Sequence, residues 1–279
     1  MDIKYLFRDN IFGDDPYAPN EEELLMKGNR GTLFAVLFRA GGNEKHPSVL
    51  LLHGYPGNEQ NLDIAQALRR VGFNVLTMHY SGSWGCDGKF SFANVLDDAK
   101  TGLAFLQDEE NQKLYNIDPD NIFVVGHSMG GFATLHTTAD CSGIKGAIAL
   151  APFDFGREYM LAQTDDSEKE VMEGPIAFGA EWLNTTWQEL YKELKDHQKE
   201  FEIEYKAEQI ADTPLLIIGG SNDNVAKVSV NGKYLADKIA AVGKGKTDYM
   251  ELPSTHCFPD MRITLTEEIA KKLISWVEA

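Results

Sequence analysis

The hexapeptide GHSMGG at residues 126–131 places a serine between glycines, directly after the apolar run 122–125. A serine hydroxyl is a weak nucleophile at neutral pH. It needs a base to take its proton and hydrogen-bond donors to stabilise the charge that develops on a substrate. A G-x-S-x-G sequence between a strand and a helix is typical of a sharp turn that exposes the serine hydroxyl. Side chains at Gly126 or Gly130 would collide with neighbouring backbone in such a turn. The sequence therefore predicts that Ser128 is a nucleophile.

A candidate acid and a candidate base follow the serine along the chain. Asp223 lies just after the apolar run 214–218, and His256 lies just after the run 249–252. This chain order of nucleophile, acid and base is one of those in which catalytic triads occur. We expect His256 to be the base and Asp223 to orient its imidazole. The alternative acid is Asp154, which follows an earlier apolar run.

Two backbone N–H groups are candidates for an oxyanion hole. One belongs to Met129, the residue after the proposed nucleophile, and the other to Tyr55 in the glycine-containing loop HGYPG. A loop of this kind, directly after a strand, can turn an N–H group toward the serine. His53 in the same loop is a rival base, but we interpret it as a structural residue that is hydrogen-bonded within the loop. We interpret His127, which precedes the serine, as a residue that packs beneath the turn.

Short apolar runs alternate with amphipathic segments along most of the chain, and this alternation predicts a mostly parallel sheet with helices on both faces. A hairpin at 21–27 and 32–39 precedes the predicted strands 48–52, 74–78, 122–125, 146–150, 214–218 and 249–252. Helices are expected at 62–71, 92–106, 129–140, 228–242 and 266–277. Residues 153–212 interrupt the alternation with an acidic, helical pattern. We interpret the chain, 1–279, as one α/β domain with a helical insertion, whose site lies beyond the carboxyl ends of the strands.

The composition excludes several classes of function. The net charge of −17 argues against nucleic-acid binding, which requires clustered lysine and arginine. The sequence contains no apolar stretch that is long enough to span a membrane, and its first residues do not resemble a signal peptide. The three cysteines have no CxxC spacing, so neither a disulfide framework nor a zinc site is expected. We expect a cytoplasmic protein that uses no metal or organic cofactor; the pattern does not specify its oligomeric state.

The motifs HGYPG, GHSMGG, GGSNDNVA and STHCF occur in this order over nearly the whole chain. Together they resemble those of α/β-hydrolase-fold serine hydrolases, in particular bacterial carboxylesterases and acylaminoacyl-peptidase-like hydrolases. Residues 80–88 resemble the G-x-G-x-S-x-G loop of these enzymes, with departures at Trp84 and Cys86. The resemblance implies that residues 153–212 form a cap and that Trp84 lines the substrate pocket. Trp182 and Trp187 either face the pocket as well or pack the insertion onto the main domain.

The resemblance and the residues together predict a reaction. Ser128 would attack a carbonyl carbon while His256 takes its proton, and water would then release the acyl-enzyme. Carboxylic esters are the expected small-molecule substrates. The alternative is a peptidase of the aminoacyl-peptidase type, although Met129 stands where those peptidases tend to have an aromatic residue. A third interpretation is a binding protein that has this fold and no activity.

Overall fold

A single eight-stranded sheet organises the computed structural model, which describes residues 1–279 apart from the side chain of residue 168. The strand order across the sheet is β1-β2-β4-β3-β5-β6-β7-β8. The strands are β1 (Asn20–Gly28), β2 (Gly31–Arg39), β3 (His46–Leu52), β4 (Asn74–Met78), β5 (Ile117–His127), β6 (Gly146–Leu150), β7 (Leu215–Gly220) and β8 (Thr247–Leu252).

The sheet is mostly parallel, as the alternation of the sequence predicts. β1 and β2 form an antiparallel hairpin, and β2 also pairs antiparallel with β4. All the remaining neighbours pair in parallel. Every residue of β3, β4, β6 and β7 is buried. This explains why these strands appear in the sequence as continuous apolar runs rather than as alternating patterns.

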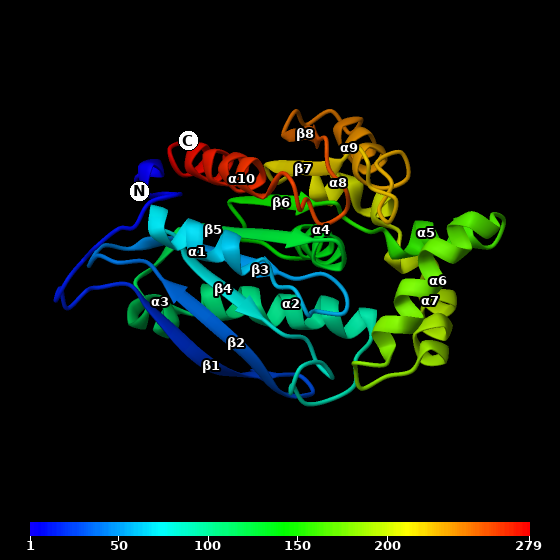
Figure 1. Cartoon of the computed structure of the whole chain (residues 1–279), viewed down its shortest axis with the longest axis horizontal. Coiled ribbons are helices and arrows are strands. Elements are labelled where there is room, and N and C mark those ends of the chain that lie inside the picture. Colours follow the sequence, from blue (N-terminus) through cyan, green and yellow to red (C-terminus); the bar gives the residue numbers. More distant parts are fainter.

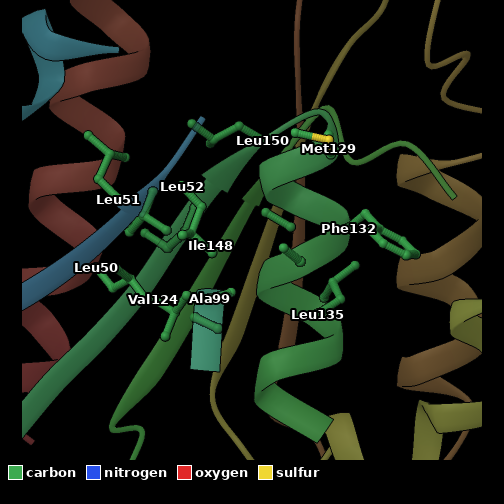
Figure 2. Close-up of a cluster of buried hydrophobic side chains, with 14 of the residues drawn as sticks. Leu50, Leu51, Leu52, Ala99, Val124, Met129, Phe132, Leu135, Ile148 and Leu150 are labelled. Carbon is green, nitrogen blue, oxygen red and sulfur yellow. The ribbon is translucent and has the colours of Figure 1, made fainter. Parts of the chain in front are cut away.

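Helices cover the sheet, and most of them follow a strand directly. They are α1 (Leu62–Val71), α2 (Phe92–Gln107), α3 (Glu109–Leu114), α4 (Met129–Asp140), α5 (Phe155–Ala162), α6 (Asp166–Ala180), α7 (Trp187–Phe201), α8 (Ala207–Ile210), α9 (Gly232–Ala240) and α10 (Arg262–Val277), with short 3-10 helices at Ile3–Tyr5 and Ile203–Lys206. Figure 2 shows the strands lying between α4 and the faint red helix α10, with leucine, isoleucine and valine side chains filling the space. In the part of the chain that the structure describes, no helix is long and apolar enough to cross a membrane.

The residues between β6 and β7 form a group of helices, as the sequence predicts. We call residues 151–214 the β6–β7 segment; it contains α5, α6, α7 and α8. In Figure 1, α5, α6 and α7 lie at the right of the view, beyond the end of the sheet toward which β5 points. Thr186 and Glu189 form a capping box at the start of α7. That the segment acts as a cap stays a prediction.

Two helix starts differ from the sequence-based prediction. The last helix begins at Arg262, four residues before the expected start, and the guanidinium of Arg262 is bound there by Asp63 and Asn61. The helix predicted from 228 begins at Gly232 instead. Asn231 just before it has a non-helical backbone and accepts a hydrogen bond from the N–H of Asp154 at 2.8 Å. Both starts depend on distant partners, which local periodicity does not reveal.

Candidate active site

Ser128 occupies a strained turn between β5 and α4. Its backbone angles are φ 56° and ψ −116°, in a region that residues with side chains rarely adopt. The neighbouring glycines permit the turn: a Cβ on Gly126 would lie 2.1 Å from the carbonyl oxygen of Gly130, and one on Gly130 would lie 2.1 Å from that of Leu52. The strain and close packing are those expected of a turn that exposes a serine hydroxyl.

The parallel register brings the next three loops to the same edge of the sheet. His127 pairs with Leu150, Leu150 with Ile218, and Ile218 with Met250. The chain therefore leaves β5, β6, β7 and β8 at neighbouring points, and the side chains that follow these strands can meet.

His256, which follows β8, is hydrogen-bonded to Asp223, which follows β7. The Nδ1 atom of His256 lies 2.8 Å from Oδ2 of Asp223. The other carboxylate oxygen accepts the N–H groups of Val225 and Ala226 at 2.8 and 2.9 Å. Burial alone would raise the pKa of Asp223, but these hydrogen bonds and the nearby imidazole bring it below its usual value. An ionised carboxylate only accepts, so Nδ1 of His256 carries a proton and Nε2 is the basic nitrogen.

Asp154, the alternative acid, has a different set of partners. It is fully buried at the start of α5, where one carboxylate oxygen accepts the N–H of Arg157 at 3.0 Å and the other that of Ile203 at 3.1 Å. Burial raises its pKa to about 7. Asp154 therefore ties the beginning of the β6–β7 segment to a later part of it, whereas Asp223 is the acid within hydrogen-bonding distance of His256.

His127 has a role in the site that the sequence does not reveal. Its ring is buried, in keeping with a position beneath the turn. Its Nε2, however, donates to the backbone carbonyl oxygen of His256 at 2.8 Å, and the two ring centroids are 4.8 Å apart. Burial lowers the pKa of His127 to about 3, so the ring is neutral. The only signal in the sequence is the position of His127 beside Ser128.

The loop after β3 lies against the proposed nucleophile. A Cβ on Gly54 would be 3.2 Å from the Cβ of Ser128, which places the backbone of this loop beside the serine. His53 donates from Nδ1 to the carbonyl oxygen of Gly54 at 2.7 Å, and burial lowers its pKa to about 3. His53 thus bonds within the loop. Tyr55 also contacts the β6–β7 segment, because its hydroxyl donates to the carbonyl oxygen of Ile176 in α6 at 2.7 Å.

Met129 is the first residue of α4 and is buried. The first N–H groups of a helix have no partner within the helix, and the helix dipole favours negative charge near them. The N–H of Met129 is thus suited to an oxyanion, and the loop that carries Tyr55 lies beside the same serine.

The three tryptophans considered for the pocket lie in different surroundings. Trp84 is 38% exposed, and its indole N–H donates to the carbonyl oxygen of Pro56 at 2.8 Å. Trp182 is 59% exposed and lies beside Phe178. Trp187 is partly buried at the start of α7, with its ring 5.1 Å from that of Tyr191. Trp84 and Trp182 therefore present more free aromatic surface than Trp187, which packs within the segment.

A mostly parallel sheet covered by helices, with a serine on the sharp turn after β5, defines the α/β-hydrolase fold. The chain belongs to the Hydrolase_4 family, described as serine aminopeptidase, S33, whose family model matches residues 43–202, more than half of the chain. The resemblance drawn from the sequence motifs is thereby confirmed at the level of fold and hydrolase family.

Two curated proteins show the range of similar sequences. The "Putative esterase/lipase 2" of Mycoplasma genitalium is 23% identical over 235 residues, which cover 77% of this chain and 85% of that protein. Cutinase 2 of Thermobifida cellulosilytica is 25% identical over 145 residues, 52% of this chain and 54% of the cutinase. The chain thus spans only about half the length of the cutinase.

Solved structures share the fold at low sequence identity. The acylaminoacyl peptidase of Pyrococcus horikoshii aligns with a TM-score of 0.69 at 15% identity, covering 91% of this chain and 41% of that one. Est1E from Butyrivibrio proteoclasticus aligns with a TM-score of 0.68 at 16% identity, covering 92% and 99%. At such identities the likeness extends to the fold alone.

Proposed function

We propose that the protein is a serine hydrolase that cleaves carboxylic esters through an acyl-enzyme, with Ser128 as nucleophile. The observation that carries the proposal is the hydrogen bond between His256 and Asp223 at the edge of the sheet where Ser128 stands. It fixes the imidazole tautomer in which Nε2 can accept a proton, which is what a serine nucleophile requires.

The first half of the reaction acylates the serine. Nε2 of His256 takes the hydroxyl proton of Ser128 as its oxygen attacks the ester carbonyl carbon. The N–H groups of Tyr55 and Met129 donate to the resulting oxyanion. When the tetrahedral intermediate collapses, the bond between the carbonyl carbon and the alcohol oxygen breaks, and the imidazolium returns its proton to the leaving alcohol.

The second half releases the acid. His256 takes a proton from water, the hydroxide attacks the acyl carbon, and the serine oxygen leaves and recovers its proton. Asp223 stabilises the imidazolium in both halves. The reaction as written needs no metal or organic cofactor, so EDTA should leave the rate unchanged.

We propose that the β6–β7 segment is a cap on a single domain and that Trp84 and Trp182 contribute aromatic surface to the substrate site. Their exposed surface supports this assignment. For Trp187, the ring contact with Tyr191 favours the alternative, in which it packs the segment together.

A peptidase is the second candidate, since the family description names a serine aminopeptidase. The names of the similar curated proteins, an esterase/lipase and a cutinase, favour esters. A panel of p-nitrophenyl acyl esters of increasing chain length, assayed beside aminoacyl-p-nitroanilides, distinguishes the two. We expect hydrolysis of the esters and no cleavage of any anilide above the uncatalysed rate. Cleavage of an anilide would make the protein a peptidase.

A further inference from the structure

Tyr55 connects two parts of the molecule that are more than one hundred residues apart in the chain. Its backbone belongs to the loop after β3, beside Ser128. Its hydroxyl donates to the carbonyl oxygen of Ile176, in α6 of the β6–β7 segment, at 2.7 Å. Burial raises the pKa of Tyr55 far above its usual value, so the hydroxyl keeps the proton that it donates.

The contact between Tyr55 and α6 is also tight in its packing. Gly179 of α6 lies directly on the ring: a Cβ there would be 2.1 Å from Cε1 of Tyr55 and 2.9 Å from its hydroxyl oxygen. On its other sides the ring packs against Phe90 and Phe92, with centroids 5.6 and 6.1 Å away. The ring therefore has little room to move independently of α6.

Further hydrogen bonds connect the two sides of this contact. Asn184, just after α6, donates from its N–H to the carbonyl oxygen of Gly82 at 2.8 Å and from its side chain to that of Gly88 at 2.7 Å. Trp84, between these glycines, donates to the carbonyl oxygen of Pro56 at 2.8 Å. The β6–β7 segment therefore holds Tyr55 directly, through the bond to Ile176. It also holds Pro56 indirectly, because the segment is bonded to the loop that carries Trp84.

We infer that Tyr55 is a positioning residue through which α6 sets the place of the oxyanion-hole N–H. Tyr55 carries both the side chain that Ile176 and Gly179 fix and the N–H group that donates to the oxyanion in the proposed reaction. A shift of α6 would therefore move this donor relative to Ser128. An oxyanion-hole donor acts only when it is close to the position that the oxyanion will occupy. The inference rests on the proposed function, which gives the Tyr55 N–H this task.

A pair of glycines in α6 provides a matched test. Gly179→Ala would press a methyl group onto the Tyr55 ring, whereas Gly174→Ala adds the same methyl to the same helix at a point with nothing within 4 Å. We expect Gly179→Ala to lower kcat for a p-nitrophenyl ester by about 10- to 100-fold, as for a misplaced oxyanion-hole donor. KM should change by less than about 3-fold, because the donor acts mainly in the transition state. The kcat of Gly174→Ala should stay within about 2-fold of that of the unmodified protein.

A second pair of measurements shows whether the effect passes through Tyr55. In a Tyr55→Ala background the methyl group added at position 179 has space, so Gly179→Ala should then lower kcat by less than about 2-fold. Tyr55→Phe removes only the hydroxyl and should lower kcat by about 3- to 10-fold, the equivalent of one lost hydrogen bond. Tyr249→Phe, which loses a hydroxyl bonded to Glu251 on β8, is the control and should not change kcat.

Fluorophosphonate labelling of every variant separates this inference from the proposed function. Two results would show that the inference is wrong while the proposed function stands, provided that Ser128 is labelled. In one, Gly179→Ala and Gly174→Ala have the same kcat; in the other, the effect of Gly179→Ala persists in the Tyr55→Ala background. If Gly179→Ala does not fold, an unchanged kcat in Tyr55→Phe would overturn the inference equally well. If the label is found on a serine other than Ser128, both are wrong.

Discussion

Nδ1 of His256 and Oδ2 of Asp223 are 2.8 Å apart, although the two residues follow different strands and are 33 positions apart in the chain. Each partner is fixed by further contacts. The second carboxylate oxygen of Asp223 accepts two backbone N–H groups, and the carbonyl oxygen of His256 accepts the ring N–H of His127. Because both ends of the bond are held, the imidazole of His256 is fixed in orientation, with Nδ1 bound to Asp223.

The first prediction compares the two acids. Asp223→Asn should lower kcat by about four decades, because an amide in this place can stabilise the wrong imidazole tautomer. Asp154→Asn should lower kcat far less, since the carboxylate of Asp154 bonds to Arg157 and Ile203 in the β6–β7 segment. Both variants would be assayed with the same neutral ester. Equal losses, or a larger loss at Asp154, would contradict the assignment of the acid.

The second prediction concerns stability and pH. Burial raises the pKa of Asp154 from 3.8 to about 7, so the folded state binds this proton more tightly than the unfolded state does. The contribution of the protonated carboxyl to stability is therefore complete below pH 3.8 and is lost as the pH rises through about 7. An asparagine does not titrate. The Tm advantage of the unmodified protein over Asp154→Asn should consequently be larger at pH 5 than at pH 8.

Asp223 provides the control of opposite sign for that experiment. Its pKa is lowered on folding, so its contribution to stability is present above the unfolded pKa and is lost as the pH falls through the folded value. The Tm advantage over Asp223→Asn should therefore shrink in acid, below about pH 4. An Asp154 advantage that stays constant or grows between pH 5 and pH 8 would contradict the burial argument.

The third prediction concerns His127, which bonds to the backbone of His256 and therefore acts through that residue. His127→Leu removes the donor and should lower kcat by about tenfold, the equivalent of one hydrogen bond, with little change in KM. His127→Gln keeps an N–H donor close to the place of Nε2 and should restore most of kcat. Equal losses in both variants would indicate that the packing of the ring matters and the hydrogen bond does not.

The strands and the residues that follow them could be predicted from the sequence because both signals are local. Continuous apolar runs mark strands that are buried on both faces, and the glycines around Ser128 mark a turn that needs them. Asp223 and His256 could be paired in the same way, since each follows a strand at the same edge of the sheet.

The contacts that hold the site in place could not be predicted, because each joins residues that are distant in the chain. The bond from Tyr55 to Ile176 spans 121 positions, and the bond from His127 to His256 spans 129. Tyr55 and His127 both lie in glycine-rich turns. Nothing in the sequence around either residue indicates that its side chain bonds to another element. For the same reason, Asp154 resembles a catalytic acid by its place after β6, although its bonds are to Arg157 and Ile203.

The most direct test of Ser128 as the nucleophile is to identify the residue that a fluorophosphonate modifies. The reagent phosphonylates an activated serine, and peptide mass spectrometry locates the adduct. We predict a single adduct on Ser128, loss of ester hydrolysis in step with labelling, and no labelling of Ser128→Ala, whose kcat should fall by about three to six decades. An adduct on another serine, or full ester hydrolysis by Ser128→Ala, would contradict the assignment.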